Sequence, residues 1–205
     1  MSLTTEWTNA DPERTALIVV DMQNVYCHPD GSFGKIGRDV TNLRAAIPGC
    51  VDLVAAAREQ GRRVVHIVTH FRDDYRDGGR IFNVARPQVR DVGGGRSGTW
   101  DVQIIDELTP DPEDIIVHKR RYSGFFGTNL DSVLRANDVT SVAVCGVTTN
   151  ICVGTTARDA AQHDYATFVP RDATAELQQS FHESALETLQ NYYCSVVSVR
   201  ELAGA

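Results

Sequence analysis

The chain has 205 residues, of which 42% are hydrophobic, and its formal net charge is −7 at pH 7. This length and hydrophobic content predict one well-packed domain. The negative charge argues against nucleic-acid and acidic-membrane partners, and no apolar run approaches the roughly 20 residues that span a bilayer. We therefore expect no nucleic-acid partner and no membrane partner.

Cysteine usage and the first residues predict the compartment. The five cysteines are odd in number, irregularly spaced and without a CxxC pair. Such usage predicts free thiols in a reducing cytoplasm rather than a disulfide framework. The polar, acidic stretch 1–14 resembles neither a signal peptide nor a transit peptide. We expect a flexible N-terminal segment over 1–14 and a single domain over 15–205.

Short apolar, β-branched runs predict six strands, at 16–22, 63–70, 114–119, 141–147, 165–172 and 194–202. Most of these runs are continuously apolar, which is typical of strands buried on both faces of a parallel sheet. Helical patterns alternate with the strands. This alternation predicts a three-layer α/β/α sandwich around a mainly parallel six-stranded sheet, joined by right-handed crossovers.

The helical patterns cover 40–54, 128–137, 151–163 and a last helix. We expect Pro48-Gly49 to kink or divide the first of them. Thr128 and Asp131 are spaced like a capping box at the start of the second. The apolar stripe of the last helix comprises Phe181, Ala185, Leu186 and Leu189.

Residues 71–98 interrupt the alternation. The segment holds six arginines, four aspartates and six glycines and has little periodicity. A connection this long in a compact domain is usually functional or mobile. Three interpretations stay open: a lid over a site, a contact between subunits, and a solvated charged loop.

Three predicted strands end in residues that carry chemistry. Asp21 follows ALIVV, Lys119 ends DIIVHK, and Cys152 follows SVAVCGV after a short polar turn. Singly, each has a structural explanation: a turn cap, a surface charge and a small core residue. Because ligands bind beyond the carboxyl ends of parallel strands, the three together predict a site.

The chemistry of this set favours Cys152 as a nucleophile. A thiolate is the reactive form, and a free cysteine has a pKa near 8.5. We expect a helix N-terminus and the ammonium of Lys119 to lower the pKa of Cys152. Asp21 is then placed to accept the thiol proton and return it to the leaving group.

The same residues carry a family resemblance. The segments ALIVVDMQN, KRRYSGFFGTNLDSVLR and CGVTTNICVGTTARDA resemble the isochorismatase-like cysteine hydrolases over about residues 15 to 200, and the pattern G-x-x-T-[ND]-x-C-V is the most specific of them. The resemblance implies a Rossmann-like hydrolase fold and an Asp21–Lys119–Cys152 triad. It also implies a cis peptide at Val147-Thr148, with the N–H groups of Thr148 and Cys152 forming an oxyanion hole. We expect Thr149 and Asn150 to support the turn without touching substrate.

The family contains subgroups with different reactions. Members that hydrolyse the vinyl ether of isochorismate lack the cysteine, so Cys152 points to C–N hydrolysis through a thioester. Nicotinamidases bind a metal through one Asp and two His. Here His66 and His70 are four residues apart, about 13 Å along a strand, which is too far to share one ion. His70 with Asp73 forms only a partial site, so we expect neither metal nor cofactor.

The motifs are most similar to those of ureidoacrylate amidohydrolase and N-carbamoylsarcosine amidase. DMQNVY and the segments 99–110 and 121–128 match the former, whereas HIVTHFRDD does not. The resemblance implies hydrolysis of a small ureido or carbamoyl acid with release of ammonia, by a homodimer or homotetramer. The exact acid stays open. Candidate substrate-binding residues are Gln23, Phe33, His70, Trp100 and Tyr122, although Phe33 and Trp100 also suit core packing.

Other classes of function are also considered. One alternative is isochorismatase-type or nicotinamidase-type activity, and another is a non-hydrolytic binding domain, which the intact Asp/Lys/Cys set disfavours. A further one is thiol exchange by Cys152, for which Cys27 is the candidate resolving cysteine. The chain has no GxGxxG fingerprint, which disfavours a nicotinamide-dependent enzyme.

The absence of a three-ligand cluster in the sequence gives a prediction about metals. Exhaustive treatment with EDTA should leave hydrolysis of the small amide substrate unchanged, because no step needs a Lewis acid. Ammonia release before and after chelation measures this. Loss of activity that Zn²⁺ or Mn²⁺ restores would contradict the assignment and favour the nicotinamidase interpretation.

Overall fold

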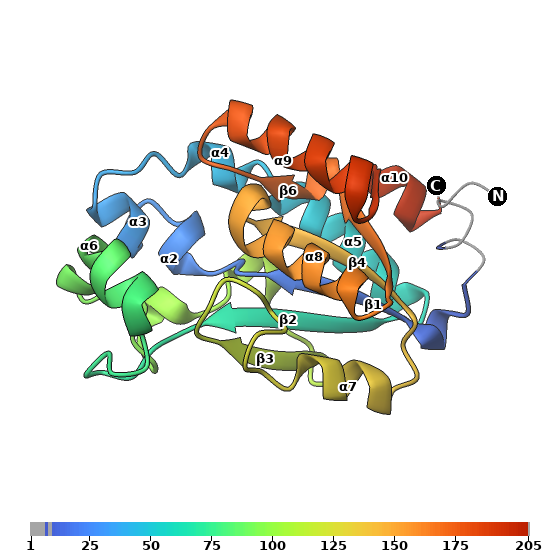
Figure 1. Ribbon diagram of the computed structural model, residues 1–205, viewed down its shortest axis with the longest axis horizontal. Helices are drawn as coiled ribbons and strands as arrows, with labels where there is room; N and C mark the ends of the chain where they lie inside the picture. The colour runs from blue at the N-terminus through green and yellow to red at the C-terminus, as the bar shows by residue number, and fades with distance from the viewer. Residues whose placement is uncertain (1–6, 8–9, 205) are drawn as a thin grey trace.

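The computed structural model describes Trp7 and residues 10–204, and its centre is one parallel sheet (Figure 1). Within this part of the chain the sheet has the order β3-β2-β1-β4-β5-β7, and β6 pairs with β4. All these pairings are parallel. The strands are β1 (Thr15–Val20), β2 (Arg63–Thr69), β3 (Ile115–Lys119), β4 (Ser141–Val147), β5 (Ala166–Pro170), β6 (Thr174–Ala175) and β7 (Ser195–Val197).

Helices cover both faces of this sheet, which confirms the three-layer architecture. The helices are α2 (Asn24–Cys27), α3 (Ser32–Lys35), α4 (Thr41–Arg44), α5 (Ile47–Glu59), α6 (Pro87–Asp91), α7 (Leu130–Ala136), α8 (Gly154–Gln162), α9 (Gln179–Tyr192) and α10 (Val199–Ala203). Buried residues of α4, α5 and α10 form one core, and those of α7, α8 and α9 form the other. Alternate residues of β1 enter the two cores, Leu17 in the first and Ile18 in the second, as the period of two requires.

The predicted strand count was too low by one among the described residues. The additional strand, β6, is only two residues long and pairs Thr174 with Gly146 and Ala175 with Val147. A pairing this short has no periodicity that a sequence pattern can show. Its position matters because it flanks the end of β4, where the candidate nucleophile follows.

One predicted strand boundary and one predicted helix cap need correction. The strand predicted over 194–202 ends at Val197, because Ser198 and Glu201 form a capping box that begins α10. In α7 the expected capping box of Thr128 with Asp131 does not form. Instead Thr128 Oγ1 accepts a bond from Leu130 N, 3.1 Å away, while Asp131 pairs with Arg135.

The other helices follow their patterns with local differences. The pattern over 40–54 divides into α4 and α5, and Pro48 lies in the first turn of α5, where its missing N–H costs nothing. In α9 Phe181 is 50% exposed, whereas His182 is buried with Ala185 and Leu186. Phe181 therefore does not belong to the core stripe.

The N-terminal segment predicted to be flexible is only partly described, because residues 1–6 and 8–9 lie outside the described residues. Trp7 is buried, and its indole N–H donates to the carbonyl of Leu202 at 3.1 Å. The guanidinium of Arg62 lies 4.6 Å from the centre of its ring. Trp7 thus packs on the domain.

The long segment 71–98 has structure of its own. It contains a π-helical turn, Ile81–Ala85, and α6, and α2, α3 and α6 lie beyond the arrowhead of β2 (Figure 1). The carboxylate of Asp101, which is buried, accepts bonds from Ser32 N, Ser32 Oγ and Gly95 N at 2.8–2.9 Å. The segment is therefore tied to the neighbouring helix α3. None of the described helices has the length and apolar character needed to cross a bilayer.

Candidate active site

Asp21 follows the last residue of β1 and turns into the site. Its backbone takes the left-handed conformation, with φ of 54°, and its N–H donates to Ile67 O at 2.9 Å. The hydroxyl of Thr69, at the end of β2, donates to Asp21 Oδ1 at 2.8 Å. The carboxylate is 1% exposed. Two neighbouring strands therefore fix the orientation of this buried carboxylate.

Lys119 is the last residue of β3, and its side chain is also only 1% exposed. Its Nζ lies 2.8 Å from Asp21 Oδ2, 3.1 Å from the carbonyl oxygen of Arg121 and 3.4 Å from Cys152 Sγ. An ammonium has three N–H donors and no acceptor. The ammonium thus makes two hydrogen bonds and one ion pair, and the structure brings together the three predicted residues.

Cys152 reaches this point through the turn after β4. The Val147-Thr148 peptide is cis, as predicted, and Thr148 O accepts bonds from Ile151 N and Val153 N at 3.1 Å within the π-helical turn Thr149–Val153. Gly146 has φ of 106°, and a Cβ there would lie 2.1 Å from Val20 O. Only glycine allows β4 to approach β1 this closely. The oxyanion role of the Thr148 and Cys152 N–H groups stays a prediction.

The electrostatics of Cys152 differ from our expectation. Burial raises the pKa of its thiol to about 12; Lys119 acts to lower this pKa and Asp21 acts to raise it. Lys119 therefore acts on this pKa in the expected direction, but burial outweighs the ammonium, so the net pKa is raised rather than lowered. Burial acts to lower the pKa of Lys119, but Asp21 and Cys152 together hold it above its ordinary value. The resting site is a neutral thiol beside an ion pair.

The triad lies on the wall of a cavity of about 470 Å³. Phe33 and Tyr122, two of the predicted substrate residues, also line it. Its volume falls within the range of small-molecule sites, and most of its lining surface is apolar. The cavity provides a place where a small substrate can meet the thiol.

Three predicted substrate residues lie outside the cavity lining. Gln23 is buried, and its amide bonds Thr69 O, Thr69 N and Val102 O, so it holds the strand ends together. His70 packs edge-on against His118, with ring centres 4.6 Å apart. Trp100 is 44% exposed and packs on His28. Their side chains are directed elsewhere, so the cavity gives no support to their predicted role in binding, which stays a prediction.

The cavity includes residues that the sequence did not single out. Tyr26 lies in the first helical turn after Asp21, and its ring meets Phe33 edge-on at 4.9 Å. Burial and then the negative charge of Asp21 raise the pKa of Tyr26, so its phenol is neutral. Because Tyr26 follows Asp21 closely in the sequence, its place near the site could have been predicted. Phe71 and Phe82 also line the cavity, but the aperiodic segment that carries them gave none.

A second layer of polar contacts supports the turn that carries Cys152. Thr149 Oγ1 lies 2.8 Å from the Nδ1 of His182, which fits the supporting role predicted for Thr149. Asn150 N donates to Glu176 Oε2 at 3.2 Å. Asn150 and Glu176 both line the cavity, so the prediction that Asn150 stays remote from substrate is weakened.

The candidate metal ligands lie apart from one another. His66 is buried, and its Nε2 lies 3.2 Å from Asp114 Oδ2, whereas His70 packs on His118. Among Trp7 and residues 10–204, no group of three or more His, Cys, Asp or Glu side chains is arranged to hold a metal ion.

Comparison with known proteins places the chain in a family. The isochorismatase domain family matches residues 15–201. Ureidoacrylate amidohydrolase RutB of Cronobacter sakazakii is 37% identical over 206 residues, which cover 95% of this chain and 89% of that protein. The crystal structure of a cysteine hydrolase from Pseudomonas syringae has a TM-score of 0.87 at 32% identity and covers 95% of this chain and 93% of its own. N-carbamoylsarcosine amidase from Thermoplasma acidophilum has a TM-score of 0.72 at 28% identity, with coverages of 91% and 96%.

The position of Lys119 and Asp21 beside the sulfur predicts opposite shifts in thiol reactivity. Lys119→Ala should slow alkylation of Cys152 by iodoacetamide at a fixed pH, because the thiol pKa rises when the ammonium is lost. Asp21→Asn should leave alkylation unchanged or speed it, because a negative charge is removed. Each unit of pKa increase should slow the reaction by about threefold, since the thiolate fraction falls while its nucleophilicity rises.

The alkylation rates are read by mass spectrometry of the peptide that contains Cys152. Cys194, which is also partly buried but outside the cavity lining, serves as the internal control for general reagent effects. An unchanged Cys152 rate in Lys119→Ala would contradict the electrostatic contact between the ammonium and the sulfur.

Proposed function

The chain belongs to the isochorismatase family, and we propose that it is a cysteine hydrolase that cleaves a C–N bond of a small ureido or carbamoyl acid. The observation that carries this proposal is the contact of one buried ammonium, Lys119, with both Asp21 and Cys152 on the wall of a cavity. The 37% sequence identity to ureidoacrylate amidohydrolase and the fold shared with N-carbamoylsarcosine amidase support the substrate class.

The first half of the reaction forms a thioester. Asp21 accepts the Sγ proton as Cys152 attacks the substrate carbonyl, so a buried thiolate need not accumulate. The N–H groups of Thr148 and Cys152 stabilise the oxyanion of the tetrahedral intermediate. Asp21 then donates its proton to the leaving nitrogen, and the C–N bond breaks. For a ureido acid the products are a free amine and a carbamoyl group on the sulfur.

The second half regenerates the thiol. Asp21 accepts a proton from water, whose oxygen attacks the thioester carbonyl, and the C–S bond breaks as the proton returns to the sulfur. Carbamic acid leaves and decomposes to carbon dioxide and ammonia. Lys119 remains an ammonium throughout and offsets the negative charge that moves between Asp21 and Cys152.

The charges that line the cavity support an acidic substrate. The pair of Asp21 and Lys119 is neutral overall, and Glu176 is the remaining carboxylate of the lining. Arg38 and Arg86 also line the cavity without a carboxylate partner among the described residues, and the guanidinium of Arg38 rests 5.2 Å from the ring centre of Phe33. A surplus of arginine in a protein of net charge −7 favours a carboxylate ligand.

The proposal predicts that turnover depends on the sulfur of Cys152. Cys152→Ala and Cys152→Ser should abolish ammonia release, because the nucleophile is lost while the side-chain volume stays similar. Cys194→Ser should remain active. The assay panel comprises ureidoacrylate, N-carbamoylated amino acids, maleamate, nicotinamide and biuret, with the highest rates expected for ureido or carbamoyl acids.

The residual rate of the Cys152 variants decides whether the proposal holds. If either Cys152 variant retains more than about a tenth of the wild-type rate, the barrier has risen by less than about 1.4 kcal/mol and covalent catalysis by this residue is wrong. Turnover of nicotinamide alone would overturn the substrate class and leave the nucleophile intact.

A further inference from the structure

The third contact of Lys119 joins the catalytic set to the backbone two residues further along the chain. Two of its partners, Asp21 and Cys152, belong to the proposed reaction, and the third is the carbonyl oxygen of Arg121 at 3.1 Å. A carbonyl oxygen has no part in the proton transfers. Its effect is to orient the ammonium, so the position of the Arg121 backbone helps to set the position of Nζ.

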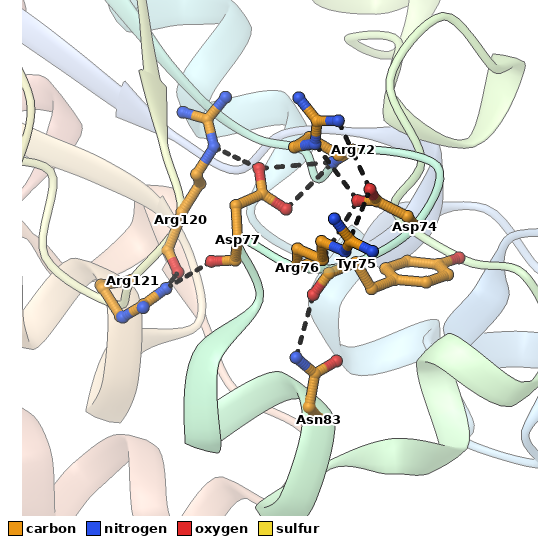
Figure 2. Close-up of polar contacts among 8 residues, drawn as sticks. All are labelled: Arg72, Asp74, Tyr75, Arg76, Asp77, Asn83, Arg120 and Arg121. Atoms are coloured by element: carbon orange, nitrogen blue, oxygen red, sulfur yellow. Dashed lines mark hydrogen bonds and ion pairs between the residues drawn. The ribbon is translucent and has the colours of Figure 1, made fainter.

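The side chains of Arg120 and Arg121 are in turn bonded to Asp77. The Nε of Arg120 donates to Asp77 Oδ2, and Arg121 Nη1 donates to the backbone carbonyl of Asp77 at 3.0 Å and to Arg120 O. Figure 2 shows Arg120 and Arg121 reaching Asp77 from one side and Arg72 from the other. Asp77 therefore connects the segment 71–98 to the residues that follow β3.

The carboxylate of Asp77 is well suited to this contact. Its side chain is 17% exposed, and Arg72 N donates to Oδ1 at 3.1 Å and to Oδ2 at 3.3 Å. Burial acts to raise the pKa of Asp77, but its bonds from Arg120 and Arg72 hold that pKa below the ordinary value. The group is thus ionised at neutral pH, and its charge-assisted bond to Arg120 is stronger than a neutral one.

A neighbouring carboxylate provides the contrast. Asp74 lies in the same segment and also pairs with arginines, through Arg72 Nε at 3.2 Å and Arg76 Nε at 3.7 Å. It also accepts a bond from Arg76 N, as Asp77 does from Arg72 N. All of these partners belong to the segment itself (Figure 2). Asp74 therefore shapes the segment locally, whereas Asp77 joins it to the end of β3.

We propose that Asp77 is a positioning residue for Lys119, acting through the backbone of Arg120 and Arg121. This inference rests on the proposed function, because it assumes that the ammonium must lie beside the sulfur. The same segment supplies Phe82, Arg86 and Val89 to the cavity wall. The contact at Asp77 thus joins the segment that supplies part of the cavity wall to the residues that follow Lys119.

The test compares Asp77→Asn with Asp74→Asn, two isosteric changes that each remove one carboxylate charge from the same segment. Asp77→Asn should lower kcat about tenfold or more, up to the ~10²-fold that a 1 Å misplacement can cost. It should also slow alkylation of Cys152 at a fixed pH by a few-fold, because a displaced ammonium no longer favours the thiolate. Asp74→Asn should stay close to wild type in both measurements.

The alkylation rate separates the possible failures, because it needs no substrate. If Lys119→Ala slows alkylation but Asp77→Asn does not, the positioning role of Asp77 is wrong and the proposed function stands. If Lys119→Ala has no effect either, the proposed function fails first. Equal loss in Asp77→Asn and Asp74→Asn would show a general effect of segment structure and overturn the inference.

Thermal unfolding of each variant provides the folding control. Should Asp77→Asn unfold below the assay temperature, Arg120→Lys carries the same comparison, because it keeps the positive charge beside the cavity and loses the Nε donor to Asp77. Slower alkylation in Arg120→Lys supports the inference, and an unchanged rate overturns it.

Discussion

The ion pair between Asp21 and Lys119 is the interaction on which the site depends. Both side chains are only 1% exposed, and removing two charges from water is costly unless each has a close partner. The 2.8 Å contact, the Thr69 hydroxyl and the Arg121 carbonyl supply those partners. Together they hold a thiol beside a pair that is neutral as a whole. In the proposed reaction, attack on a carbonyl transfers the proton of Cys152 to Asp21.

The parallel sheet provides the geometry that makes this pair possible. β1, β2, β3 and β4 are neighbours in the sheet, and their carboxyl ends present Asp21, Thr69, Lys119 and the turn before Cys152 at one edge. Residues far apart in the chain therefore meet without any long-range adjustment. The segment 71–98 completes the site from outside the sheet, through aromatic residues of the cavity wall and through Asp77.

The parts that were predictable from sequence are those that local patterns encode. The alternation of apolar runs with helical patterns predicted the parallel sheet, and the residues at three strand ends predicted the meeting of Asp21, Lys119 and Cys152. The cis peptide was implied by the family resemblance. Burial of a particular group was not predictable. The raised pKa of Cys152 depends on how tightly distant segments cover the thiol, and the residues next to it in the sequence do not predict this burial.

The cavity wall was the least predictable part. Gln23 and Trp100 were expected to contact substrate, but the fold directs Gln23 to backbone groups and Trp100 towards His28. Phe82 and Glu176 reach the cavity from segments whose positions depend on tertiary contacts rather than on periodicity. Sequence patterns thus predict which residues lie at the end of a strand, whereas the residues of the cavity wall depend on how loops fold over the sheet edge.

The most direct test of this account is to trap the acyl group on the sulfur. The enzyme is mixed with the best ureido or carbamoyl acid of the panel, quenched in acid during turnover and digested for peptide mass spectrometry. The account predicts a mass increase of one acyl group on the peptide that contains Cys152, present only while substrate remains. Product formation without any such adduct in wild-type enzyme, or an adduct on a different residue, would contradict it.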